Sequence, residues 1–182
     1  MSIPRRWPRT PRATRRIGLD RRGIRLPTEA EWEVVCRGGT NTAYSFGNEV
    51  QLLGRYGWFL ENSEKRSHAV GQLRPSVRGL FDLHGNLFEW CYDWYSGYAG
   101  DAVEGVPGED PTGSPQGSIR VYRGGGWNYG AADCRSAYRE NSRPTRRINY
   151  LGIRVAAFPF SQASESAKEG AREAGSESRE AD

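Results

Sequence analysis

GLFDLHGNLFEWCYDWY, residues 79–95, is the stretch that decides the fold. In its second half aromatic residues alternate with other residues, and a period of two is typical of a β-strand. The aromatic positions are Phe88, Trp90, Tyr92 and Trp94. Such rings bury a large apolar area, so we expect their face of the strand to lie against the centre of the domain. The opposite face carries Glu89 and Asp93, which need water, a cation or a partner.

A tight turn at His84-Gly85-Asn86 precedes this strand. Asp82 and Glu89 flank the turn, whose bent backbone can direct carbonyl oxygens inward. Carboxylate and carbonyl oxygens are the ligands that a hard cation such as calcium prefers, so the spacing permits an oxygen-rich metal site. His84 and His68 are interpreted as structural, because neither belongs to a cluster with the ligand spacing of zinc sites.

Composition predicts one loop-rich domain with tails. The chain has 182 residues, 36% of them hydrophobic, with 23 Gly and 10 Pro. It contains no apolar run long enough to cross a membrane and no secretory signal, so no membrane role is expected. The chain has three cysteines, Cys36, Cys91 and Cys134. So small and odd a number cannot form a complete disulfide framework. That usage favours a reducing, cytoplasmic compartment.

The two ends of the chain are expected to be disordered. Residues 1–23 are rich in arginine, and residues 161–182 form a charged tail, and neither has the apolar residues needed for a core. The domain is therefore assigned to residues 24–160. A nucleic-acid-binding arm is the alternative reading of the basic segment, but it has neither interleaved aromatic residues nor a binding motif. Nucleic acid is accordingly not expected as a partner.

Within the domain, RLPTEAEWE predicts the start of a helix, because Thr28 and Glu31 form a capping box. Gly38-Gly39 is expected to end that helix. Further short strands or irregular aromatic segments are predicted, with a long loop before the fourth of them. The expected segments are 43–49, 56–62, 68–71, 120–123, 134–139 and 152–158, and the loop is 96–117.

Four stretches in this order resemble the sulfatase-modifying factor family, whose type member is the formylglycine-generating enzyme. They are RLPTEAEWE, GLFDLHGNLFEWCYDWY, RVYRGGGW, and CRSAYREN with LGIRVA. The resemblance spans about residues 24–158. It implies an α+β fold, a variant of the C-type lectin-like fold with short mixed strands, few helices and long loops. It also implies that the N-terminal part of the domain is missing here, which would leave a strand edge unpaired.

The resemblance further implies a structural calcium site. Its ligands would be the carboxylates of Asp82 and Glu89 and the carbonyls of Gly85 and Leu87. The family enzyme binds Cu(I) between two cysteines and converts a substrate cysteine into formylglycine. Its first cysteine corresponds to Tyr129 here.

The second copper cysteine is placed differently by two counts. Counting from Gly124 puts it at Cys134, whereas counting back from Pro144 puts Cys134 further along. On either count the thiol at Tyr129 is missing, and a phenol is a poor ligand for Cu(I), so copper is not expected. Cys134 is assigned to the core.

We therefore expect a ligand- or protein-binding module without oxidase activity. Its partner would be a peptide, a protein or a small polar ligand held by exposed aromatic and polar side chains. The expected groove residues are Trp127, Asn128, Tyr129, Arg135 and Tyr138. The alternatives are a copper-dependent formylglycine-generating oxidase and an accessory domain of a larger, kinase-linked signalling protein.

Overall fold

A computed structural model describes residues 23–97, 114 and 116–157 of the chain. Its main feature is a four-stranded sheet with the strand order β4-β3-β2-β5. The strands are β2 (Phe88–Trp94), β3 (Arg120–Arg123), β4 (Arg139–Ser142) and β5 (Leu151–Ile153). β2 pairs antiparallel with β3 and parallel with β5, and β3 pairs antiparallel with β4. β1 (Ile24–Arg25) and β6 (Ala156–Ala157) form a second, two-stranded sheet. This mixture of short strands and few helices agrees with the predicted α+β class.

The helix α1 (Glu29–Arg37) begins and ends where the sequence predicts. The Thr28 hydroxyl accepts a hydrogen bond from the Glu31 amide, and the Glu31 carboxylate accepts one from the Thr28 amide. Gly38 ends the helix with φ of 59°, a conformation that glycine adopts without strain. α1 packs against β2 and β3. The described residues also contain two 3-10 helices, η1 (Val50–Arg55) and η2 (Ala131–Cys134).

The predicted orientation of β2 is wrong. Glu89, Cys91 and Asp93 are buried, whereas three of the four aromatic residues are only partly buried, Phe88 being the exception. The buried carboxylates are tolerated because they accept hydrogen bonds. Glu89 accepts from the Trp32 indole at 2.7 Å, and Asp93 accepts from the Glu29 amide at the start of α1, also at 2.7 Å. The acidic face of β2 therefore lies against α1.

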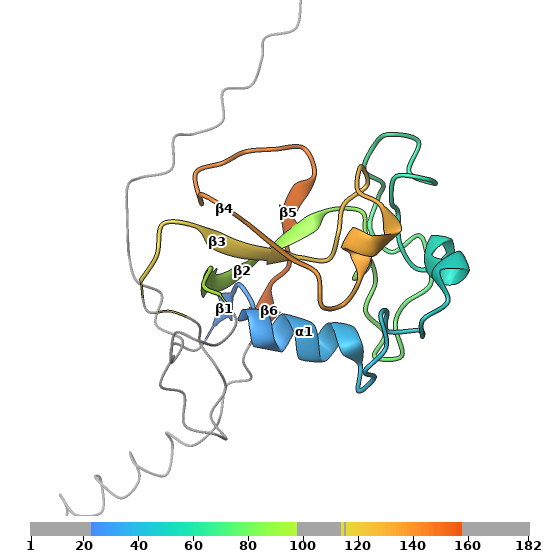
Figure 1. The fold of residues 1–182 in the computed structure, drawn as a ribbon, viewed down its shortest axis with the longest axis horizontal. Helices are drawn as coiled ribbons and strands as arrows, with labels where there is room; N and C mark the ends of the chain where they lie inside the picture. The colour runs from blue at the N-terminus through green and yellow to red at the C-terminus, as the bar shows by residue number, and fades with distance from the viewer. Residues whose placement is uncertain (1–22, 98–113, 115, 158–182) are drawn as a thin grey trace, which may run out of the picture. The chain divides into compact units, whose positions relative to one another are not determined.

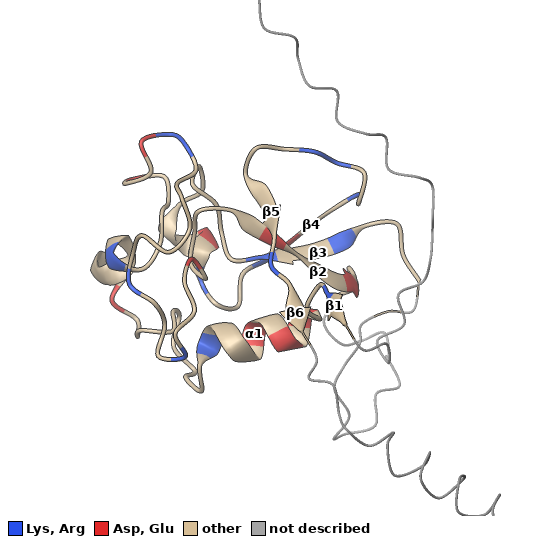
Figure 2. Cartoon of the chain, turned by 180° about the vertical axis from the view of Figure 1, so that it is seen from behind, with Lys and Arg blue, Asp and Glu red and all other residues tan. Residues whose placement is uncertain are grey.

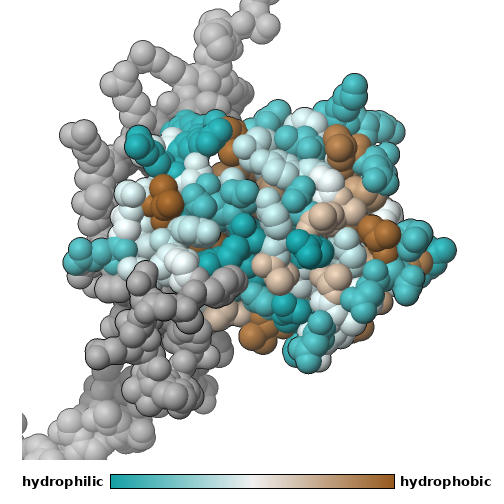
Figure 3. All heavy atoms as spheres, in the orientation of Figure 1, coloured by the Kyte–Doolittle hydropathy of each residue, from teal (hydrophilic) through white to brown (hydrophobic). Residues whose placement is uncertain are grey.

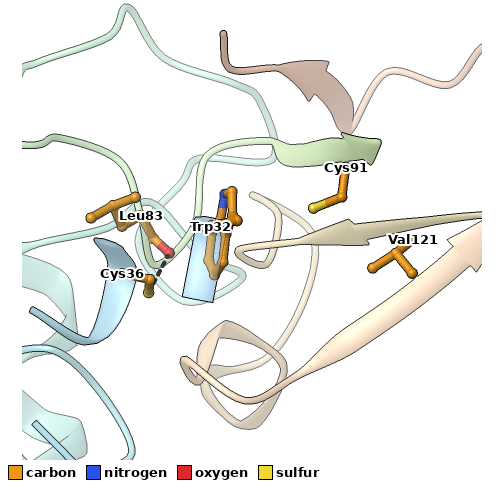
Figure 4. Packing of buried hydrophobic residues seen from close by; sticks show 5 residues of the cluster. All are labelled: Trp32, Cys36, Leu83, Cys91 and Val121. Carbon is orange, nitrogen blue, oxygen red and sulfur yellow. Dashed lines mark hydrogen bonds between the residues drawn. The ribbon is translucent and has the colours of Figure 1, made fainter. Parts of the chain in front are cut away.

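Two apolar clusters form the core. The first lies between α1 and the sheet and joins Trp32, Cys36, Leu83, Cys91 and Val121, as Figure 4 shows. The second consists of Tyr44, Leu53, Phe59 and Cys134. All three cysteines are buried and unpaired. On the surface drawn in Figure 3 the strongly hydrophobic residues are scattered between polar ones, so this face carries no large apolar patch.

The turn before β2 packs directly on a distant backbone segment. A Cβ atom added to Gly57 would lie 2.1 Å from the His84 carbonyl oxygen, and one added to Gly85 would lie 2.3 Å from the Trp58 carbonyl oxygen. The Asn86 amide donates to the Trp58 carbonyl at 2.6 Å. Because only glycine permits such close approach, these two positions fix the turn against residues 57–58.

Other predicted strands differ in the structure. Residues 68–71 form no strand, and 134–139 begins as the end of η2, with β4 starting only at Arg139. Residues 43–49 and 56–62 are irregular apart from an isolated bridge between Tyr44 and Gly47. The predicted closing strand is divided into β5 and β6. The predictions for residues 1–22, for 98–113 within the loop and for 158–182 lie outside the described residues. No helix in the described part is long and apolar enough to cross a membrane.

Candidate functional site

Five aromatic side chains gather on the face of the sheet opposite α1. We call them the tyrosine cluster: Phe88, Tyr122, Tyr129, Tyr138 and Tyr150. Phe88 lies at its centre, with ring centroids 4.9 Å from Tyr122, 4.8 Å from Tyr129 and 6.3 Å from Tyr138. Tyr150 lies 5.3 Å from Tyr129. Edge-to-face contacts of this kind stabilise the cluster, and its partly exposed members give a surface of rings and hydroxyl groups.

The hydroxyl groups of Tyr122, Tyr129 and Tyr138 stay protonated at neutral pH. Burial, with the nearby Glu140 carboxylate, raises the pKa of Tyr122 to about 12. Burial and a hydrogen bond with Tyr150 raise the pKa of Tyr129 further above its ordinary value. Burial and the hydrogen bond to Glu140, which accepts from the Tyr138 hydroxyl at 3.0 Å, raise the pKa of Tyr138. These three groups therefore do not present phenolates to a metal.

The structure brings most of the predicted groove residues together. Tyr129 and Tyr138 belong to the tyrosine cluster, and the Trp127 indole donates to the Asn149 carbonyl, one residue before Tyr150, at 3.2 Å. Asn128 lies between Trp127 and Tyr129, and its side-chain oxygen is buried without a hydrogen-bond partner.

Arg135 does not join them. Its guanidinium donates to the Ala132 carbonyl at 2.7 Å, and its charge acts on Tyr44 in the second core cluster. Arg135 follows η2 directly, as the residue that caps its C-terminal end. Tyr122 and Tyr150 are site residues that the sequence analysis missed. The available signal for Tyr122 was the alternating sequence of β3, and for Tyr150 it was the position directly before β5.

Cys134 and Tyr129 lie in different surroundings. Cys134 is fully buried in the second core cluster with Tyr44, Leu53 and Phe59, whereas the Tyr129 ring contacts Phe88 and Tyr150. Burial raises the pKa of the Cys134 thiol to about 12, so it is protonated at neutral pH. A protonated, enclosed thiol is a poor nucleophile. The predicted core role of Cys134 is consistent with this burial.

Asp82 and Glu89 line one cavity of about 350 Å³, together with Leu87, Arg154 and several apolar residues. Asp82 Oδ2 accepts from the Gly71 amide at 2.8 Å, but Asp82 Oδ1 is buried without a partner. Each of the two Glu89 carboxylate oxygens accepts a hydrogen bond from Arg154 at 2.8 Å. One of these oxygens also accepts from the Trp32 indole. Burial raises the pKa of Glu89, Arg154 opposes that shift, and the nearby Asp82 charge adds to it.

These donors fit a calcium ion only in part. The unpaired Asp82 Oδ1 is a hard oxygen ligand on the cavity wall, whereas both Glu89 oxygens already accept hydrogen bonds from Arg154. Gly85 lies in the adjoining turn and Leu87 on the cavity wall. Within the described part of the chain no three His, Cys, Asp or Glu side chains gather at one point. Calcium would therefore take the rest of its ligands from carbonyls and water.

Both histidines hold structural positions. His84 is buried, its Nδ1 lies 2.9 Å from the Cys134 carbonyl, and its Nε2 accepts from the Ser45 amide at 3.1 Å. Burial lowers its pKa to about 4, so the ring is neutral at physiological pH. The His68 ring stacks on Trp58 at 3.8 Å. These contacts agree with the structural interpretation of both residues.

A buried charge network, missed by the sequence analysis, ties α1 to the sheet. Arg123 on β3 is fully buried, donates to Glu29 at 3.2 Å and also pairs with Glu33. It donates in addition to the carbonyls of Ser136 and Ala137. Arg139 on β4 pairs with Glu29 as well. Figure 2 shows these acidic positions in red along α1.

The chain matches one family model and several known proteins. A family model described as sulfatase-modifying factor enzyme 1-like domain matches residues 13–158. Serine/threonine-protein kinase pkn1 of Chlamydia pneumoniae is 38% identical over 135 residues, which cover 74% of this chain and 21% of the kinase. Formylglycine-generating enzyme of Thermomonospora curvata is 34% identical over 153 residues, which cover 76% of this chain and 50% of the enzyme.

The chain also resembles solved structures. Treponema denticola variable protein 1 matches with a TM-score of 0.71 and 38% identity, covering 78% of this chain and 50% of that one. The chain thus spans half the length of these relatives or less.

Proposed function

Because the chain belongs to the sulfatase-modifying factor enzyme 1-like family, we propose that it is a binding module of that family and not a formylglycine-generating oxidase. The observation that carries this proposal is the tyrosine cluster. Tyr129 stands where the resemblance places the first copper cysteine, and it is a protonated phenol packed on Phe88. A Cu(I) site needs two soft sulfur ligands, and this position supplies neither sulfur nor phenolate.

The same residues suit binding. Partly exposed aromatic side chains provide contact area at little entropic cost, and hydroxyl groups add directional hydrogen bonds. Asn128 adds a buried acceptor without a partner. The ligand we propose is a protein or peptide segment lying across Trp127, Tyr129 and Tyr138, or a small polar ligand at the same residues. We assign the scaffold to the C-type lectin-like variants.

Calcium is the metal we propose for this module, held by Asp82, Glu89 and the carbonyls of Gly85 and Leu87. The unpaired Asp82 oxygen supports this assignment. Bound there, the ion would stabilise the turn before β2 and take no part in ligand chemistry. We also propose a reducing, cytoplasmic location, which the three unpaired buried cysteines support.

An accessory role in a signalling protein is the second candidate. It is favoured by the 38% identity to the kinase pkn1, of which this stretch forms 21%. A binding module attached to a kinase would direct it to a partner. This role is compatible with the first and concerns the longer protein.

Oxidase activity is the competing function, and a turnover assay decides between the two. The purified chain is incubated aerobically with Cu(I) and a peptide containing Cys-x-Pro-x-Arg, and aldehyde is detected by aminooxy labelling and mass spectrometry. We expect no aldehyde, while the Thermomonospora curvata enzyme converts the peptide under the same conditions. Aldehyde formation by this chain that Cys134→Ser abolishes would refute the proposal.

A further inference from the structure

The loop from Arg143 to Arg147, here called the arginine loop, joins β4 to β5 and is exposed along its length. It contains Arg143, Arg146 and Arg147, and a turn holds it, with the Arg146 amide donating to the Arg143 carbonyl at 2.9 Å. Figure 2 shows blue stretches on this loop. Within the described residues none of the three guanidinium groups pairs with a carboxylate, whereas Arg123, Arg139 and several other arginines do. Three unneutralised charges within five residues form a site for an anionic group.

This loop borders the tyrosine cluster. Its C-terminal end continues into Asn149, which accepts from the Trp127 indole, and into Tyr150, whose carbonyl accepts from the Phe88 amide at 2.9 Å. The charge of Arg146 acts on Tyr122, since it opposes the rise in the pKa of that phenol. Arg146 therefore lies within electrostatic range of the aromatic surface.

Two residues next to members of the cluster carry hydrogen-bond acceptors. Asn128 Oδ1 is buried without a partner, and the Glu140 carboxylate lies beside Tyr138. The amide groups of a peptide backbone donate to such acceptors, whereas a phosphodiester backbone carries acceptors only. Carboxylate side chains form paired hydrogen bonds with arginine at the loop.

We propose that the ligand of this site is an acidic peptide segment, with carboxylates on the arginine loop and its backbone and apolar side chains on the tyrosine cluster. This inference rests on the proposed function and names the partner class for the same surface. Recognition through rim arginines makes the association salt-dependent, because exposed charges are screened within about 10 Å at 0.1 M ionic strength.

The test measures fluorescence anisotropy of a labelled peptide in which four glutamates are followed by Leu-Tyr, titrated with the full chain. The loop variant combines Arg143→Gln, Arg146→Gln and Arg147→Gln. We expect it to bind the acidic peptide at least 10-fold more weakly than the unchanged chain, and we expect raised salt to weaken the unchanged chain's binding. Circular dichroism of each variant establishes that it is folded.

A matched control removes the same charge elsewhere. It combines Arg55→Gln, Arg74→Gln and Arg78→Gln, three exposed arginines outside the arginine loop. We expect less than a 2-fold change in affinity. Equal losses in the two triple variants would mean nonspecific attraction and would overturn the inference. So would a single-stranded oligonucleotide of equal charge that binds as tightly as the peptide.

A second variant separates this inference from the proposed function. Trp127→Ala alters the aromatic side of the site without changing charge, and we expect it to weaken the acidic peptide at least 5-fold. If the peptide binds through Trp127 but independently of the arginine loop, the binding module stands and its acidic specificity fails. If the peptide does not bind at all, the proposal of an acidic peptide ligand is wrong. The turnover assay separately decides whether the chain is a binding module or an oxidase.

Discussion

Arg123→Ala is expected to lower the free energy of unfolding by about 3–5 kcal/mol, the range found when one partner of a buried ion pair is removed. Arg123 is fully buried and donates to two carboxylates of α1 and to two backbone carbonyls. Without this guanidinium, the negative charges of Glu29 and Glu33 near the sheet are less well neutralised. The Ser136 and Ala137 carbonyls also lose the hydrogen bonds that Arg123 donates. Urea unfolding followed by tryptophan fluorescence measures the effect.

Arg37→Ala is the control for that experiment. Arg37 pairs with the same Glu33 at 2.7 Å, but the pair is partly exposed and lies on one turn of α1. We expect it to cost about 1 kcal/mol or less, since solvent screens such pairs. Equal losses for the two variants would show that Arg123 contributes only surface charge, contrary to its role in holding α1 on β3.

Calcium is expected to stabilise the chain measurably. At a concentration about 100-fold above its dissociation constant, a ligand specific for the folded state adds about 2.7 kcal/mol. For a domain of this size that corresponds to a rise in Tm of roughly 5–10 °C. Differential scanning fluorimetry with calcium and with EDTA measures the rise. The physical reason is the unpaired buried oxygen of Asp82 beside Glu89.

Asp82→Ala should abolish the calcium-dependent rise in Tm. Asp82 has φ of 59°, so alanine there also lowers the baseline stability, and the informative quantity is therefore the difference with and without calcium. Asp133→Ala, which removes a carboxylate from η2, should retain the full rise. A rise that survives in Asp82→Ala, or none in the unchanged chain, would mean that calcium does not bind there.

Local features were predictable from the sequence because their causes are local. The capping box of Thr28 and Glu31 and the glycine that follows α1 fix that helix within about ten residues. The alternating residues of β3 and the turn before β2 were likewise identified. Motif order identified the family, which the matched residues 13–158 confirm.

Features that depend on distant partners were not predictable. Alternation on β2 gave two faces but not which one is inward. The acidic face is inward because Trp32, Arg154 and the start of α1 supply donors from other parts of the chain. In the same way, the residues next to Arg123 in the sequence give no indication that it pairs with Glu29 and Glu33.

The candidate site was predicted in part for the same reason. Trp127 to Tyr129 are contiguous, so the motif alone placed them together. Tyr122 and Tyr150 come from β3 and from the residue before β5, and only the sheet pairing brings their rings to Phe88. Arg135 was misplaced because η2, a single 3-10 turn without a side-chain cap, left no recognisable signal.

Uptake of Cu(I) tests the central claim most directly. The reduced chain competes for Cu(I) with a chromogenic chelator, and X-ray absorption identifies any sulfur ligands. With a protonated phenol at position 129 and Cys134 enclosed in a separate core cluster, we predict no stoichiometric uptake. One Cu(I) per chain, bound by sulfur and lost in Cys134→Ser, would contradict the account.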